Sequence, residues 1–164
     1  MQITYSGIVT RKEYTAALQM HFNRAFKWIR IACGIILAIL IVALVFTLAT
    51  QPDNLSALFP GVVFPFILLS FPWWMPILQA SGYNQPGNIY RAPVHGVIDE
   101  NGISVNNQNM QSKFLWNTFV NSIKNGEIVL LYQGKNSFNV FTISMFQSPA
   151  DWEAFLALLK AKNI

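Results

Sequence analysis

Two long apolar segments without a charged side chain occupy most of the chain between residues 31 and 78. The first covers residues 31–49, and the second covers residues 55–78 after a short polar turn. A helix needs roughly 20 apolar residues to cross the hydrocarbon core of a bilayer. Only 11% of the 164 residues are charged, whereas a typical soluble domain has about 25%. The sequence therefore predicts a transmembrane hairpin with spans at residues 31–49 and 55–78.

A cleaved signal peptide is the competing interpretation of the first segment. The apolar region of such a peptide usually has about 7–15 residues and lies near the start of the chain. Here residues 1–30 come first and carry strand and helix patterns of their own. We therefore expect the first segment to be a permanent span.

The second segment contains four prolines, at positions Pro60, Pro65, Pro72 and Pro76. Each costs a helix interior roughly 3 kcal/mol in water. In lipid, however, a helix tolerates proline where neighbouring groups cover the freed carbonyls, whereas an exposed strand or loop does not occur. At 100° per residue the last three fall within about 40° of one another. We predict a kinked span with one proline face, packed on the first span. A functional hinge, or a docking surface for a partner helix or pore, is the alternative.

The distribution of cations predicts the orientation of the hairpin. Five basic side chains precede the first span, the turn between the spans has only Asp53, and the first charge after the second span is Arg91. By the positive-inside rule, both termini are cytoplasmic in a multi-pass protein of the inner membrane. Cations beside a span meet anionic headgroups, and tryptophans gather at the interface. The predicted interface residues are Arg24, Lys27, Trp28, Arg30, Trp73 and Trp74.

The net charge of +4 does not indicate nucleic-acid binding. Residues 94–164 contain as many acidic as basic side chains, and the excess lies in residues 1–30. A nucleic-acid site would need a basic patch or groove with aromatic side chains. We therefore expect no nucleic-acid partner.

Residues 1–30 combine a strand with a helix. The stretch QITYSGIV at residues 2–9 alternates as a strand does, and Thr10 with Glu13 has the spacing of a capping box. A helix is therefore expected to begin at Arg11 and to run with little interruption into the first span.

After Arg91 the pattern changes to short strands with turn residues between them. Six antiparallel strands are expected, including a hairpin in which Asn101 and Gly102 adopt positive φ. Ser148 and Pro149 then open a last helix, whose apolar stripe contains Trp152 and Phe155. We expect residues 2–9 to pair with this sheet and cover an exposed edge.

These motifs carry a family resemblance. DENGISV, the tryptophan at Trp116, IKNGEIVLLY, NVFTI and SPADWEAFLALL follow two spans in order. The chain resembles the bacterial YcxB-like family, whose C-terminal region is similar to pleckstrin-homology-like domains. The resemblance implies an α+β membrane protein: a two-helix transmembrane hairpin plus a C-terminal antiparallel β-meander closed by an amphipathic helix. It brings no defined activity.

Three parts of the chain are expected on this basis. Residues 1–30 form a strand and a basic juxtamembrane helix, and residues 31–78 form the hairpin. Residues 94–164 form a cytoplasmic pleckstrin-homology-like domain.

No residue pattern predicts catalysis. Asp99 and Glu100 are adjacent, but consecutive strand residues point to opposite faces, so a turn role is expected. His95 is interpreted as a residue at a strand edge, Cys33 as a packing residue and Trp116 as a core residue. Neither span contains a charge, and nucleotide-binding and hydrolase motifs are absent from the sequence. We predict no enzyme activity, no catalytic residue, no cofactor, no metal site and no small-molecule substrate.

Two functions remain. The first is a membrane-tethered interaction or regulatory module that holds the C-terminal domain at the cytoplasmic face, where it binds a protein or a second copy. The second is a small membrane protein that acts within the bilayer, in a helical assembly or as an immunity-type partner of a pore-forming toxin. The proline-rich span would carry the second function.

Overall fold

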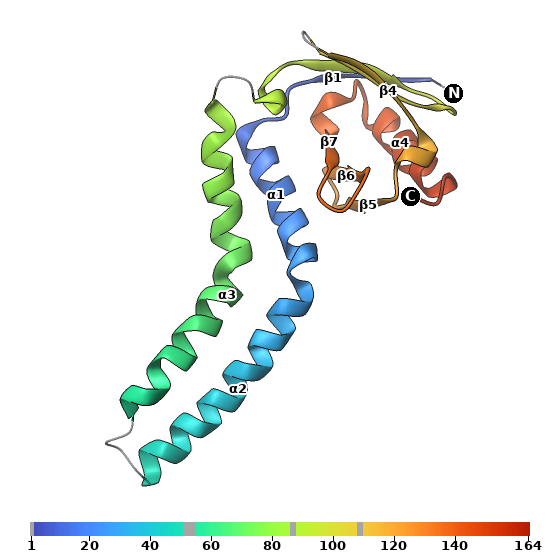
Figure 1. The fold of residues 1–164 in the computed structure, drawn as a ribbon. Helices are drawn as coiled ribbons and strands as arrows, with labels where there is room; N and C mark the ends of the chain where they lie inside the picture. The colour runs from blue at the N-terminus through green and yellow to red at the C-terminus, as the bar shows by residue number, and fades with distance from the viewer. Residues whose placement is uncertain (1, 51–54, 86–87, 108–109) are drawn as a thin grey trace. The chain divides into compact units, whose positions relative to one another are not determined.

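The structure, a computed structural model, describes residues 2–50, 55–85, 88–107 and 110–164, but not the side chains of residues 55–62, 89 and 110. The chain divides into two compact units (Figure 1). The sheet unit contains Met1–Leu18 and Gln79–Ile164, and the helical unit contains Gln19–Leu78. The sheet unit is thus built from both ends of the chain. The predicted turn between the spans lies outside the described residues.

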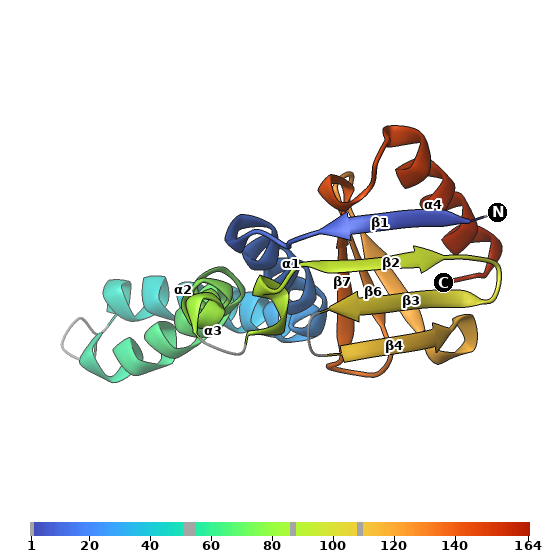
Figure 2. The same cartoon turned by 90° about the horizontal axis from the view of Figure 1, so that it is seen from above.

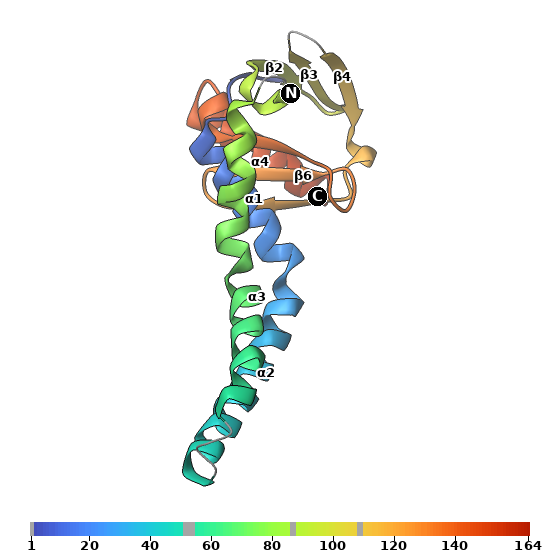
Figure 3. The ribbon, with the colours of Figure 1, turned by 60° about the vertical axis from the view of Figure 1, so that its left-hand side comes forward.

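Both predicted apolar helices are present. α2 covers Lys27–Thr50 and α3 covers Leu55–Ser81, and within the helical unit they run side by side (Figure 3). α1 covers Arg11–Ala25, and one residue, Phe26, separates it from α2. Backbone hydrogen bonds from Phe26 to Phe22 and from Arg30 to Phe26, each 2.9 Å, bridge the junction. The expected helix that runs with little interruption from Arg11 is confirmed.

In the residues that the structure describes, seven strands form two antiparallel sheets. The first sheet has the order β1-β2-β3-β4, and its strands lie side by side in Figure 2. The second has the order β5-β6-β7. The six strands expected after Arg91 are confirmed. The strand bounds are β1 Ile3–Gly7, β2 Val94–Ile98, β3 Gly102–Asn107, β4 Met110–Leu115, β5 Asn121–Lys124, β6 Ile128–Tyr132 and β7 Phe138–Thr142.

The N-terminal strand completes the first sheet. β1 pairs antiparallel with β2, from Ile3 opposite Ile98 to Gly7 opposite Val94. Tyr5 lies opposite Gly96, and its hydroxyl donates to the Ser104 carbonyl at 2.9 Å. A Cβ at Gly96 would lie 1.9 Å from that carbonyl oxygen and 2.7 Å from the Tyr5 hydroxyl. Glycine is therefore required there, and the predicted pairing of residues 2–9 with the sheet is confirmed.

The turn between β2 and β3 differs from the sequence prediction. Among the described non-glycine residues only Asn163 has positive φ, and Gly102 is not in that region either. Instead, the Asp99 carboxylate accepts from the backbone N–H groups of Asn101 and Gly102, at 2.7 and 2.9 Å. These bonds stabilise the turn through an aspartate side chain. Glycine is needed at Gly102 because a Cβ would lie 2.0 Å from the Phe114 carbonyl oxygen.

The core lies between the sheets and α4, which covers Pro149–Ala161. Ser148 caps this helix by accepting from the Asp151 N–H at 3.2 Å, as predicted. Trp152, Phe155 and Leu159 are buried on one helix face. All five residues of β6 are buried, so both faces of this strand are covered. The expected closing helix is confirmed.

Candidate functional site

A cluster of three tyrosines lies where the chain leaves the sheet unit for the apolar helices and returns. Tyr14 is in α1, Tyr83 is in η2 (Gly82–Asn84) and Tyr90 is in η3 (Ile89–Arg91). The ring centroid of Tyr14 lies 5.9 Å from that of Tyr83 and 4.8 Å from that of Tyr90. Such aromatic pairs contribute about 0.5–1.5 kcal/mol beyond their area burial. The tyrosine cluster therefore connects the start of α1 to the segment that follows α3.

Two hydroxyls of this cluster also bind backbone carbonyls. Tyr83 donates to the Val9 carbonyl at 2.7 Å, and Tyr90 donates to the Phe138 carbonyl at 3.3 Å. Burial, and to a smaller extent the nearby Tyr14, raises the pKa of Tyr90 to about 12. Burial also raises the pKa of Tyr14. Tyr83 therefore attaches the segment after α3 to Val9, which follows β1, and Tyr90 attaches the next segment to β7.

A second set of polar contacts joins the first turn of α1 to η5 (Ile143–Met145). The predicted capping box is confirmed: Glu13 Oε2 accepts from the Thr10 N–H and hydroxyl, each at 2.7 Å, and the Glu13 N–H donates to Thr10 Oγ1 at 3.3 Å. The other carboxylate oxygen accepts from the Ser144 hydroxyl at 2.7 Å. Ser144 Oγ lies 2.8 Å from the buried Thr142 hydroxyl, whose proton can point to it. We call these four residues the Glu13 network.

The Glu13 network favours the charged form of its carboxylate. Partial burial alone would raise the pKa of Glu13, but the hydrogen bonds from Thr10 and Ser144 outweigh it and lower the pKa below its ordinary value of 4.5. A carboxylate is a stronger acceptor than a carboxylic acid. The network is therefore complete at neutral pH.

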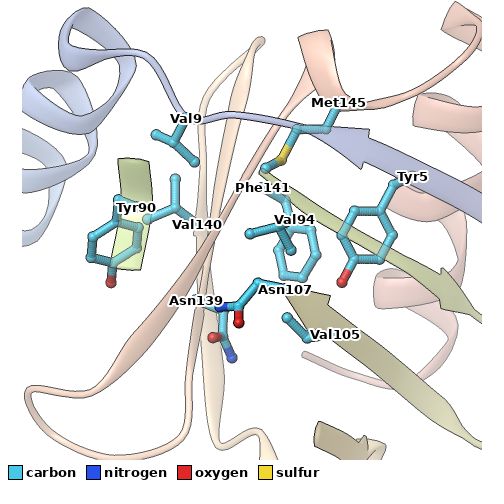
Figure 4. A pocket seen from close by; sticks show the side chains of 10 residues that line it. All are labelled: Tyr5, Val9, Tyr90, Val94, Val105, Asn107, Asn139, Val140, Phe141 and Met145. Atoms are coloured by element: carbon cyan, nitrogen blue, oxygen red, sulfur yellow. The ribbon is translucent and has the colours of Figure 1, made fainter. Parts of the chain in front are cut away.

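A cavity of about 60 Å³ lies between the two sheets (Figure 4). Its walls come from β1, β2 and β3 on one side and from β7 on the other, with Val9, Tyr90 and Met145 completing them. Most of the lining is apolar, and the polar side chains are Tyr5, Tyr90, Asn107 and Asn139. Nδ2 of Asn139 is buried without a hydrogen-bond partner in the part of the chain that the structure describes.

Two of the predicted interface residues, Arg30 and Trp73, lie close together in the helical unit. The Arg30 guanidinium lies 5.3 Å from the Trp73 ring centroid and donates to Asn23 at 3.3 Å. Trp28 and Trp73 are 76% and 54% exposed, which suits side chains at a bilayer interface. Arg24, Lys27 and Trp74 are also exposed. The structure brings Arg30 and Trp73 together, while contact of these residues with lipid stays a prediction.

The prolines of α3 share a buried face. Pro65 is buried, and Pro72 and Pro76 are less than 2% exposed. α3 runs through them without interruption. Their burial agrees with the predicted proline face packed on a neighbour and leaves little of it for an outside partner. The side chain of Pro60 lies outside the described residues.

The polypeptide from the end of β2 to α4 matches one known family, YcxB-like protein. Residues 98–159 are a YcxB-like domain. No curated protein and no solved structure matches the chain. The family resemblance drawn from DENGISV and SPADWEAFLALL is confirmed for this part. The match excludes β1, the three long helices and the tyrosine cluster, although β1 is paired into the same sheet.

Within the YcxB-like domain, two sequence predictions are confirmed. Asp99 is a turn residue, and its backbone hydrogen bonds from Asn101 and Gly102 lower the pKa of its carboxyl. Trp116, in η4 (Trp116–Thr118), is 7% exposed and donates from Nε1 to the Asp99 carbonyl at 2.9 Å. Glu100 is exposed beside Asp99. Asp99 and Trp116 therefore support the turn between β2 and β3.

The two histidines lie apart from the YcxB-like domain match. His95 is exposed in β2, but its predicted edge position is wrong, because β1 covers that edge and β2 becomes an inner strand. Burial, and to a smaller extent the positive charge of Arg24, lowers the pKa of His21.

The buried Cys33 is free, which agrees with its predicted role in packing. Within the described residues no three His, Cys, Asp or Glu side chains form a group that could hold a metal ion. The absence of a metal site stays a prediction.

Sequence reasoning missed the tyrosine cluster, Ser144 and Asn139. Tyr83 and Tyr90 lie in irregular chain between the spans and the sheet, where no periodicity marks a contact. Tyr14 directly follows the capping glutamate, which was the one available signal. Asn139 lies in an otherwise ordinary strand and could be recognised only from the cavity beside it.

Proposed function

We propose that this chain is a membrane-anchored, non-enzymatic interaction module that presents its sheet unit at the cytoplasmic face of the inner membrane. α2 and α3 anchor the protein, and the sheet unit, including the YcxB-like domain, binds a protein partner or a second copy. The tyrosine cluster and the Glu13 network attach that unit to the two segments that enter and leave the anchor.

The pairing of β1 with β2 carries this proposal. β1 precedes both apolar helices in the sequence, and β2 follows them, yet five residue pairs register the two strands antiparallel. If both helices span a bilayer, they return the chain to the side on which it started. Both ends are then available to build one sheet. A single span, or removal of the first helix by cleavage, would separate the two strands.

The exposure of the helices supports the anchor. α2 and Val63–Asn84 are long and apolar enough to span a membrane, and 6% and 22% of their most apolar windows are buried. A core helix of a soluble domain would be mostly buried. Exposed contiguous apolar surface of this extent favours contact with lipid. Apolar side chains such as Ile39, Val42 and Phe66 are 63%, 70% and 65% exposed.

The strand arrangement supports a pleckstrin-homology-like fold for the sheet unit. A four-stranded sheet and a three-stranded sheet are followed by one closing helix, with β1 supplied from the other side of the anchor. The balanced charges of residues 94–164 favour a protein surface as the partner, because clustered Arg side chains would be expected for phosphorylated headgroups.

Replacing the anchor tests this proposal against action within the bilayer. Residues 31–49 and 55–78 are exchanged for an unrelated apolar hairpin of the same length, and partners are co-purified from gently solubilised membranes. We expect the same partner with native and exchanged anchors at matched membrane abundance. Loss of the partner on exchange would contradict the proposal and favour the in-bilayer alternative. A chain with Gly96→Ala, which disrupts the first sheet, is the control that should lose the partner.

A further inference from the structure

We propose that the junction of α1 and α2 is a binding site for one anionic phospholipid, with Arg30 and Lys27 holding the phosphate of its headgroup. Arg30 has a fixed donor geometry there, which a general attraction of cations to an anionic surface does not require. This site depends on the membrane anchor proposed above, and all of its residues lie in the helical unit.

The position of Arg30 is fixed by contacts with two helices. Its guanidinium lies 5.3 Å from the Trp73 ring centroid, and its Nη1 donates to Asn23 Oδ1 at 3.3 Å. The rings of Phe26 and Phe71, with centroids 5.0 Å apart, hold α3 beside the same junction. A guanidinium has five N–H donors, so several remain for an anion. Because the half-buried Arg30 is already positioned, it loses little conformational freedom when it binds one.

Lys27 adds a second cation on the same helix face. At 100° per residue, Asn23, Lys27 and Arg30 fall within about 60° of one another, and the hydrogen bond between Asn23 and Arg30 agrees with this placement. Lys27 is exposed. The only acidic residue between positions 14 and 98 of the sequence is Asp53, which follows the opposite end of α2. At this end of α2 the helical unit therefore has no carboxylate of its own to neutralise the two cations.

The surroundings of the two cations favour a lipid as the source of the anion. The uncharged part of α2 begins at Ile31, directly after Arg30, and Ile31 and Ile35 are 45% and 58% exposed. A phospholipid would place its phosphate against the cations and its acyl chain against these apolar side chains. A free phosphate would contact the cations alone.

The chemistry of the cations favours an anionic headgroup over a zwitterionic one. Arginine binds phosphate oxygens through two parallel N–H donors, and lysine adds a point charge. A zwitterionic headgroup brings a cation of its own, which these two side chains would repel. The site therefore selects phosphatidylglycerol over phosphatidylcholine.

The experiment titrates the full chain, in a mild non-ionic detergent, with either of these two lipids. Native mass spectrometry counts the lipids bound to each chain. We expect the first phosphatidylglycerol to bind at least tenfold more tightly than the first phosphatidylcholine. Equal affinities would overturn the proposal. Glycerol 3-phosphate, a water-soluble source of phosphate, should not displace phosphatidylglycerol at a hundredfold excess, and displacement would overturn the assignment of a lipid.

Arg30→Lys separates a fixed site from simple attraction of charge. The variant keeps the positive charge but removes the planar donor pair, so the preference for phosphatidylglycerol should fall at least fivefold. Arg11→Lys is the matched control, because Arg11 is exposed in the first turn of α1 and lies outside the helical unit, and it should leave the preference unchanged. An unchanged preference in Arg30→Lys would overturn the proposal.

Lys27→Gln keeps the test valid if Arg30→Lys does not fold, because Lys27 is exposed. We expect this variant to lower the preference at least threefold. Lys12→Gln removes one positive charge from another exposed position and should leave the preference unchanged. An undiminished preference in Lys27→Gln would overturn the proposal.

A carbonate wash of the membranes tests the anchor separately from the lipid site. We expect the wild-type chain to stay in the membrane fraction. Release of the chain by the wash would contradict the anchor and overturn both proposals. A chain that stays embedded but does not prefer phosphatidylglycerol would overturn the lipid site alone.

Discussion

Glu13 joins the first turn of α1 to η5, which follows β7. It completes the capping box with Thr10 and accepts from Ser144, which lies more than a hundred residues later in the chain. Local sequence predicts the first of these contacts but not the second. The carboxylate therefore has a local role, which starts α1, and a long-range role, which positions α1 against η5.

Glu13→Gln should lower the free energy of unfolding of the sheet unit by about 1 kcal/mol at pH 7, since a cap and its charge are weakened. The folded pKa of Glu13 is depressed, so its stabilisation is present above the unfolded pKa and lost as the pH falls through the folded pKa. The difference between wild type and variant should therefore shrink below about pH 4. Thermal unfolding in nanodiscs at several pH values measures it.

Glu153→Gln is the control for this measurement, because Glu153 is exposed on α4. It should leave stability within about 0.5 kcal/mol of wild type. A pH-independent difference for Glu13→Gln would show that the carboxylate charge is not what stabilises the network.

Gly96→Ala should destabilise the sheet unit by about 3 kcal/mol or more. The added Cβ would lie 1.9 Å from the Ser104 carbonyl oxygen, which is backbone in the neighbouring strand and cannot move alone. Gly134→Ala is the matched control, since nothing lies within 4 Å of its Cβ. Chemical unfolding followed by tryptophan fluorescence compares the two. Equal stabilities would contradict the close approach of Tyr5 and Ser104 across Gly96.

Among the elements, β1 is the strand that covers the edge of β2. It converts β2 from an edge strand into an inner strand, and its Tyr5 packs edge-on against Phe141 at 5.3 Å. An uncovered edge strand is prone to pairing with other chains. The strand therefore protects the sheet as well as extending it.

Deletion of residues 2–9 should expose β2 and raise the amide hydrogen-exchange rates of Val94–Ile98 at least tenfold, because the partner strand is lost. Amides of β6, in the other sheet, should change less. Exchange measured by mass spectrometry on the full chain in nanodiscs distinguishes the two strands. Unchanged rates in β2 would contradict the pairing of β1 with β2.

Because the proline face of α3 is buried, leucine and alanine substitutions there should differ in their effect on stability. Pro72 and Pro76 are less than 2% exposed, so the larger leucine at both positions should overpack their surroundings and cost about 1–3 kcal/mol. Alanine at both positions avoids this, and the helix regains its backbone donors. Ile77→Leu, at an exposed position of α3, is the control. Thermal unfolding followed by circular dichroism in nanodiscs compares the variants, and equal stability of the leucine and alanine pairs would be contrary to the buried face.

For the molecule as a whole, the order of the elements along the chain limits the possible membrane topologies. The sheet unit combines residues that precede the helical unit in the sequence with residues that follow it. Two membrane crossings satisfy this requirement, and one crossing does not. The tyrosine cluster and the Glu13 network then anchor both connecting segments to the sheets.

Reporter fusions at the two termini test this topology. We expect cytoplasmic activity from both, because five cations precede α2's apolar stretch and β1 must reach β2 on one side. A reporter inserted at residues 51–54, between the helices, should be active on the opposite side. Termini on different sides would contradict both the hairpin and the single sheet unit.

Much of the architecture follows from local patterns. Uncharged runs predict α2 and α3 because their length and apolarity suffice, and Ser148 and Pro149 predict the start of α4 because capping acts within one turn. The alternating strands and the Thr10–Glu13 box are equally local. The positive φ expected near Gly102 was wrong because a side chain, that of Asp99, supplied the turn hydrogen bonds instead. His95 was misplaced because an edge is a property of the whole sheet.

The residues that meet across long distances in sequence could be identified only from the folded chain. Tyr14, Tyr83 and Tyr90 come together because β1 pairs with β2 and draws the two connecting segments to one place. Asn139 is one of the residues that line a cavity whose walls come from both sheets. Local residue types determine helices, strands and caps, since the interactions that form them span a few residues. Cavities and clusters depend on which distant surfaces meet, and that is a consequence of packing the whole chain.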